Sequence, residues 1–214
     1  MSQTVTIIRT GVANTASLAA AFRRLGLESV ITEDPKAIAD APLLVLPGVG
    51  AFGAGVATLD ALGIRETLVN RAGSERPLLA VCLGMQLLAE SSEETPGVRG
   101  LGIVEGVAKR FPHGCTVPQM GWNDVVAAPG TRLLESGCAY FANSFRLTQQ
   151  SSGWETATSD YAGGFVAAME RGSTLACQFH PELSGEWGLR LLGRWAGVLS
   201  TEPEYATNGA AASC

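Results

Sequence analysis

Short apolar runs alternate with helix-sized segments through the first half of the chain. The runs lie at 4–8, 29–31, 43–46 and 78–81, and Asn14 stands where it can cap the first intervening helix. Strands that alternate with helices favour a parallel sheet covered on both faces. We therefore expect an α/β fold built on a flavodoxin-like open, mostly parallel sheet with helices on both faces.

The second half has more strand-like runs and fewer helices. Arg171-Gly172 separates two of these runs and predicts a hairpin turn, and periodic leucines predict a closing helix over 184–199. We expect an antiparallel extension of the same sheet, one domain over 1–200, and a frayed tail over 201–214. The strand-like runs lie at 102–111, 125–127, 138–145, 156–158, 165–170 and 175–179.

Composition excludes several classes of protein. The formal net charge is -5 and no basic stripe could follow phosphates, so nucleic acid is not an expected partner. No secretion signal or membrane-length apolar stretch is evident, so no membrane partner is expected either. Five scattered cysteines without a Cys-x-x-Cys pair indicate reduced thiols in the cytoplasm, with no metal site and no cofactor.

Cys82 stands at a junction between a strand and a helix. Residues 77–81 read as a buried strand that runs directly into a helical segment at 82–88. This is the arrangement of a nucleophile elbow, in which the helix N-terminus stabilises a thiolate and offers backbone N–H groups to an oxyanion. Taken alone, such a cysteine is more often a small buried hydrophobe. Its neighbours in the sequence decide between the two interpretations.

His180-Pro181-Glu182 follows the last apolar strand and supplies the groups that a thiol nucleophile needs. The imidazole can act as base, and Glu182 can orient it across a proline that fixes the bend. The only other histidine, His113, lies between turn-forming residues and is expected in an exposed loop. We predict a Cys82–His180–Glu182 triad.

A glycine-rich turn, Pro47-Gly48-Val49-Gly50-Ala51-Phe52, follows the run at 43–46. Its backbone can donate to an oxyanion, so we predict an oxyanion hole formed by Val49, Gly50 and Leu83. A phosphate loop is the weaker interpretation, because the turn lacks a Gly-Lys-Ser/Thr ending.

The motifs Val-Cys-Leu-Gly-Met-Gln at 81–86 and Gln-Phe-His-Pro-Glu at 178–182 resemble those of class I glutamine amidotransferases. Within that family the chain is similar to the glutaminase subunits of imidazole glycerol phosphate synthase. The branch is distinguished by Pro-Gly-Val-Gly at 47–50 and Met-Gly-Trp-Asn at 120–123.

The resemblance implies a glutaminase that forms a heterodimer. L-glutamine would be hydrolysed through a thioester, and the ammonia would pass to a separate (β/α)8 cyclase subunit. That subunit makes imidazole glycerol phosphate and aminoimidazole carboxamide ribotide in histidine biosynthesis. By the same resemblance Gln86, Glu94 and Ser144 bind glutamine, and Met120, Gly121, Trp122 and Asn123 face the cyclase.

The chain departs from the family pattern at four places. Arg9-Thr10-Gly11 replaces Asp-Tyr-Gly, Ala80 replaces the elbow's first glycine, Gln119 replaces a histidine, and Ala142-Asn143-Ser144-Phe145 replaces Val-His-Ser-Tyr. The alternatives are sister glutaminases that serve anthranilate, aminodeoxychorismate, guanylate or pyridoxal phosphate synthesis, and a thiol-sensing flavodoxin-like protein.

Overall fold

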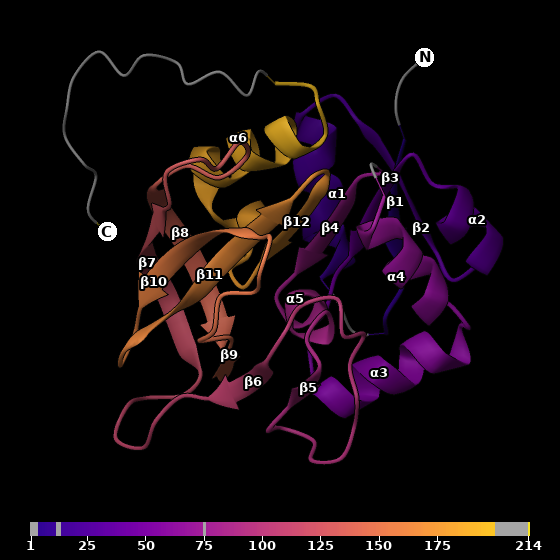
Figure 1. Cartoon of the computed structure of the whole chain (residues 1–214). Coiled ribbons are helices and arrows are strands. Elements are labelled where there is room, and N and C mark those ends of the chain that lie inside the picture. The colour runs from indigo at the N-terminus through magenta and orange to yellow at the C-terminus, as the bar shows by residue number, and fades with distance from the viewer. Residues whose placement is uncertain (1–3, 12–13, 75, 200–213) are drawn as a thin grey trace, which may run out of the picture.

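The computed structural model describes residues 4–11, 14–74, 76–199 and 214, and a nine-stranded sheet runs through them (Figure 1). The strand order is β2-β1-β3-β4-β12-β11-β10-β7-β8. A small second sheet has the order β5-β6-β9. The strands are β1 (Thr4–Ile8), β2 (Glu28–Thr32), β3 (Leu43–Leu46), β4 (Leu78–Val81), β5 (Ser91–Ser92), β6 (Val107–Arg110), β7 (Gln119–Ala127), β8 (Gly137–Asn143), β9 (Phe145–Arg146), β10 (Glu155–Asp160), β11 (Gly164–Arg171) and β12 (Thr174–Cys177).

The large sheet has a parallel half and an antiparallel half. Strands β2, β1, β3, β4 and β12 pair in parallel, and β12, β11, β10, β7 and β8 pair antiparallel. The expected α/β fold with an antiparallel extension is confirmed. The hairpin at Arg171-Gly172 is also present, since β11 and β12 pair antiparallel on either side of it. Gly172 has φ +56°, which suits the tight turn.

Helices cover both faces of the parallel strands, as expected for a parallel sheet. Alternate residues of β3 show this: Leu43 and Val45 pack with α1 and α6, whereas Leu44 and Leu46 pack with the helices on the other face. Figure 1 shows α1 and α6 together, with α3, α4 and α5 on the opposite side of the sheet. The helices are α1 (Thr15–Arg24), α2 (Pro35–Asp40), α3 (Phe52–Ala61), α4 (Arg65–Ala72), α5 (Leu83–Leu87), the 3-10 turn η1 (Pro181–Leu183) and α6 (Gly185–Trp195).

Several boundaries differ from the expectations. The strand expected over 102–111 is confined to β6, and the strand expected at 125–127 begins six residues earlier, at Gln119. The run at 138–145 breaks at Ser144, between β8 and β9. The expected tail lies outside the described residues except for Cys214.

The expectation that every cysteine is a free thiol was wrong. Cys138 of β8 forms a disulfide with Cys214, and the backbone N–H of Cys214 donates to the Asp124 carboxylate over 3.1 Å. The two cysteines are 76 residues apart in sequence, so only the fold brings them together. Cys82, Cys115 and Cys177 are free.

Across the described ranges, no helix is both long enough and apolar enough to span a membrane.

Candidate active site

Three neighbouring parallel strands end at the same edge of the sheet. The carboxyl end of β3 leads into the turn at 47–50, that of β4 into Cys82, and that of β12 into Gln178 and His180. In open α/β sheets this edge is where ligands bind. The sheet therefore gathers sequence-distant groups at one place.

Cys82 occupies the strand-to-helix turn that the sequence predicted. Its backbone has φ 54° and ψ −112°, a left-handed conformation that is unusual for a side chain with a Cβ. The turn is held by a 2.7 Å hydrogen bond from the Cys82 N–H to the carbonyl of Cys177 on β12. The residue is 7% exposed. The elbow geometry is present at this position.

His180 and Glu182 form a buried pair beside Cys82. Nδ1 of His180 lies 2.9 Å from Oε1 of Glu182, and the two side chains are 9% and 2% exposed. Pro181 starts the short turn η1 between them, which brings the carboxylate back to the ring. The expected proximity of these two residues is confirmed.

The environment of His180 favours its protonated form. Burial lowers the pKa of His180, but hydrogen bonds to Cys82 and Glu182, and the negative charges of those groups, raise it to about 10, against an ordinary 6.5. An imidazole with such a pKa remains charged at neutral pH. The arrangement therefore suits an imidazolium held between a thiolate and a carboxylate.

A clamp that the sequence analysis missed holds the backbone of His180. Its N–H donates to the Tyr140 carbonyl at 2.9 Å, and its carbonyl accepts from Oγ of Ser184 at 2.6 Å. The same Ser184 oxygen accepts from the Tyr140 N–H at 3.0 Å. Tyr140 lies 40 residues from His180 in sequence, so no local pattern could have indicated this contact.

A pocket of about 200 Å³ opens over this edge and gathers most of the predicted site residues. It also brings in Ala142, Asn143 and Phe145, which the sequence analysis noted only as departures from the family pattern. The predicted residues that line it are Val49, Gly50, Cys82, Leu83, Gln86, Glu94, Ser144 and His180.

Leu83 and Glu94, both predicted residues of the pocket, form hydrogen bonds within the protein. The Leu83 N–H donates to the carbonyl of Gly48 at 3.3 Å, so it does not point freely into the pocket. Oε2 of Glu94 accepts from the N–H of Phe52 at 2.6 Å, which ties Glu94 to the start of α3.

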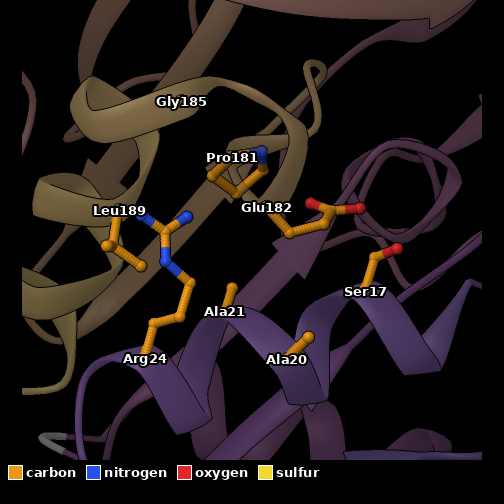
Figure 2. A pocket seen from close by; sticks show the side chains of 8 residues that line it. All are labelled: Ser17, Ala20, Ala21, Arg24, Pro181, Glu182, Gly185 and Leu189. Carbon is orange, nitrogen blue, oxygen red and sulfur yellow. The ribbon is translucent and has the colours of Figure 1, made fainter.

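A second pocket, of about 150 Å³, is lined by Glu182. Figure 2 shows the Glu182 carboxylate above α1, with the Ser17 hydroxyl on one side and the Arg24 guanidinium on the other. Arg24 pairs with Glu186 at 2.6 Å. Oε2 of Glu182 is buried and has no hydrogen-bond partner among the described residues.

The residues predicted to face a partner lie on β7, outside the pocket. Met120 and Trp122 are 68% and 54% exposed. The Trp122 ring packs edge-on against Tyr140, with ring centroids 6.1 Å apart. Gly121 and Asn123 lie on the same strand, and the amide of Asn123 donates to the carbonyl of Asp160. His113 is exposed in a turn, as expected.

Comparisons with known proteins indicate a family. The profile of the family described as "Glutamine amidotransferase class-I" matches residues 6–192. "Imidazole glycerol phosphate synthase subunit HisH" of Methanothermobacter thermautotrophicus is 40% identical over 198 residues, which cover 91% of this chain and 98% of that protein. The subunit of the same name from Symbiobacterium thermophilum is 38% identical over 208 residues, covering 93% and 98% of the two chains.

Two further comparisons bear on architecture. "Imidazole glycerol phosphate synthase hisHF, chloroplastic" of Arabidopsis thaliana is 37% identical over 89% of this chain, but the match covers only 33% of that protein. A crystal structure of a glutamine amidotransferase superposes with a TM-score of 0.73 at 21% identity, covering 91% of this chain and 97% of the other. That structure shares the fold.

Proposed function

The chain belongs to the glutamine amidotransferase class-I family, and on that premise we propose that it is the glutaminase subunit of an imidazole glycerol phosphate synthase. One structural observation supports the proposed reaction most directly. A strained cysteine at a strand-to-helix turn lies beside an imidazole that is itself paired with a buried carboxylate. These are the groups that acyl transfer through a thioester requires.

The first half of the reaction transfers the glutamyl group to Cys82. The sulfur adds to the carboxamide carbon of glutamine, and the carboxamide oxygen takes up the negative charge. The C–N bond then breaks while His180 gives its proton to the departing nitrogen. Ammonia leaves, and a glutamyl thioester remains on Cys82.

The second half returns the enzyme to its resting state. His180, now neutral, takes a proton from water as the water oxygen adds to the thioester carbon. The C–S bond breaks, glutamate leaves, and the sulfur regains its charge beside the imidazolium. Glu182 stabilises the charged imidazole at both ends of the cycle.

Glutamine is held in the pocket by groups suited to an amino acid. We assign the carboxylate of Glu94 to the substrate ammonium group, with Oε1 of Gln86 and Ser144 as neutral hydrogen-bonding groups. Glu94 already accepts from the Phe52 N–H, which fixes its orientation before substrate binds. A volume of about 200 Å³ suits one small amino acid.

Val49, Gly50 and Leu83 are the proposed oxyanion donors. Gly50 has φ +94°, a conformation that a glycine adopts without strain, and both Val49 and Gly50 line the pocket. Because the Leu83 N–H is engaged with Gly48, this donor becomes available only when the 47–50 turn moves. The described arrangement therefore fits a resting enzyme.

The partner we propose is a (β/α)8 cyclase that binds the exposed face of β7, where Met120 and Trp122 offer apolar and aromatic surface. The Arabidopsis relative supports a close association, because it carries the matching region within a longer chain. We further propose that residues 1–200 act as one domain. We place the activity in the cytoplasm because the nucleophile Cys82 is a free thiol, although Cys138 and Cys214 form a disulfide.

The experiment that tests this function measures glutamate release by the purified chain alone, with a purified cyclase, and with the cyclase and its nucleotide substrate. We expect release in the complete mixture and none from a Cys82→Ala control. Absence of glutamate from all three mixtures, with folded wild-type protein, would contradict the proposal.

A further inference from the structure

Gln178 is a fully buried glutamine that reaches the nucleophile. Its side chain is 0% exposed, and Nε2 lies 3.8 Å from Sγ of Cys82. The sheet register accounts for this contact. Cys177 and Val81 are the last residues of β12 and β4 and pair in the parallel ladder. Gln178 and Cys82, which directly follow these two strands, therefore also lie side by side.

Neighbouring groups fix the orientation of the Gln178 carboxamide. Nε2 of Gln86 donates to the carbonyl of Phe145 at 3.1 Å and to Oε1 of Gln178 at 3.0 Å. Both hydrogens of the Gln86 amide are therefore used. If the Gln178 carboxamide were reversed, two NH2 groups would face each other and an amide oxygen would face the sulfur. The network thus requires the NH2 of Gln178 to point toward Cys82.

The far end of the network is also anchored. Nδ2 of Asn143 donates to the same Phe145 carbonyl at 3.0 Å, and both Asn143 and Gln86 are buried. Buried amides that satisfy one another in this way have little freedom to rotate. Gln178 is consequently held in one orientation before substrate arrives.

We propose that Gln178 donates a hydrogen bond to the Cys82 sulfur and holds the thiolate in position for attack. This role rests on the proposed function and adds a residue to it. The charged sulfur occurs twice in the cycle, before attack on the carboxamide and again as the C–S bond of the thioester breaks. A fixed donor stabilises both, and His180 remains free to transfer protons.

The test separates the donor from the rest of the network. Gln178→Glu keeps the shape and an oxygen for Gln86 to donate to, but it replaces the NH2 that faces the sulfur by an acceptor. Gln178→Met removes both functions. Thr174→Val is the matched control, because Thr174 is a fully buried polar residue at the start of β12, the strand that Gln178 follows.

The first readout is the rate at which iodoacetamide alkylates Cys82 in the full chain between pH 5 and 10, followed by peptide mapping to distinguish Cys82 from Cys115 and Cys177. A hydrogen bond to a charged group contributes roughly tenfold or more to such a rate. We expect Gln178→Glu and Gln178→Met to slow alkylation at pH 7 by about tenfold and to move its rise to higher pH. Thr174→Val should follow the wild type.

A second variant leaves Gln178 itself unchanged. Gln86→Glu presents only acceptors to Gln178, so the Gln178 carboxamide should reverse and turn its oxygen toward the sulfur. The same slowing of alkylation is expected. If any of the three variants fails to fold by circular dichroism, the remaining ones decide the question. Wild-type alkylation profiles in the folded variants would overturn the proposal.

Glutamine turnover with the cyclase and its nucleotide supplies the second readout. For Gln178→Glu we expect kcat to fall about tenfold or more with KM nearly unchanged, because the donor touches sulfur and not substrate. Alkylation does not depend on glutamine. A wild-type chain that releases no glutamate would therefore contradict the proposed function, while the alkylation profiles would still test Gln178.

Discussion

The backbone N–H of Leu83 donates to the carbonyl oxygen of Gly48 over 3.3 Å. This bond joins the first residue of α5 to the glycine-rich turn that follows β3. In the proposed mechanism this N–H donates to the tetrahedral oxygen, and a missing donor of this kind lowers kcat roughly a hundredfold. We therefore expect the free chain to be a poor glutaminase.

We predict that the cyclase raises glutamine turnover by favouring an arrangement in which the turn at 47–50 has moved. Turnover should rise at least about a hundredfold from the free chain to the complex with nucleotide, because the partner must bind the active arrangement better than the resting one. The measurement compares glutamate release by the chain alone, with cyclase, and with cyclase plus nucleotide. Equal rates in the three conditions would rule out this gate.

Gly50→Ala tests where the gate lies. Gly50 has φ +94°, and a Cβ built there meets nothing within 4 Å, so the substitution alters backbone preference without a clash. We expect the stimulation by cyclase to shrink. Gly48 differs, because a Cβ there would lie 2.6 Å from the N atom of Gly84. Gly48→Ala should therefore destabilise the fold, measured as a lower Tm. An unchanged response in Gly50→Ala would place the switch elsewhere.

Cys82→Ala and Cys82→Ser should abolish glutamine-dependent synthesis and leave the fold intact. The thiolate forms the covalent intermediate, so no other group can replace it. Free ammonia should still support the cyclase in the presence of either variant. The check is product formation with glutamine and with ammonium salt, alongside thermal unfolding. More than trace glutaminase activity in Cys82→Ala would contradict the mechanism.

The sequence indicated the candidate triad and the pocket residues, but it did not indicate the hydrogen bonds that hold them in position. Cys82 was identifiable because a strand runs directly into a helix at that point, and His180 because it ends an apolar strand with a carboxylate two residues later. Both signals are local. The Ser184–Tyr140 clamp and the Gln86–Gln178 bond join segments 44 and 92 residues apart. Spacing along the chain carries no record of such contacts.

The full length of β7 could not be predicted from the sequence, for a different reason. Met120, Trp122 and Val126 are exposed on one face of this strand while Val125 is buried on the other. An apolar residue on a solvent-facing position disturbs the alternation by which a half-buried strand is recognised. The exposed aromatic that obscured the strand is the feature that points to a partner.

Trp122→Ala should weaken binding of the cyclase. An exposed aromatic at an interface contributes roughly 2 kcal/mol or more, so Kd should rise about thirtyfold. Tyr140, against which Trp122 packs, also holds the backbone of His180, so stimulation at saturating cyclase should fall as well. Titration calorimetry and glutamate release measure the two effects. Val126→Ala is the control on the same exposed face and should change Kd much less; equal losses would argue against Trp122 as the main contact.

His180→Ala should reduce turnover nearly as much as loss of Cys82, and Glu182→Ala should reduce it less. The imidazole transfers the protons, whereas the carboxylate orients the ring and stabilises its charge. When two residues act together in one catalytic step, the losses of activity caused by replacing each of them do not add. The Cys82→Ala/His180→Ala pair should therefore be no worse than the more damaging single change. A double loss equal to the product of the single losses would show that the two residues act independently.

The imidazole of His180 should remain protonated far above neutral pH. Its raised pKa of about 10 depends on hydrogen bonds and charges from Cys82 and Glu182, which outweigh the opposing effect of burial. Removing the thiol with Cys82→Ala takes away one of these two partners, so the pKa of His180 should fall toward its ordinary value. The chain has only two histidines, and His113 is exposed in a turn, so His113→Asn assigns the two imidazole signals in an NMR titration. In the wild type the His180 signal should hold its protonated shift through pH 8 and move near pH 10, whereas in Cys82→Ala it should move at lower pH. The same midpoint in both proteins would mean that the sulfur does not hold the proton on His180.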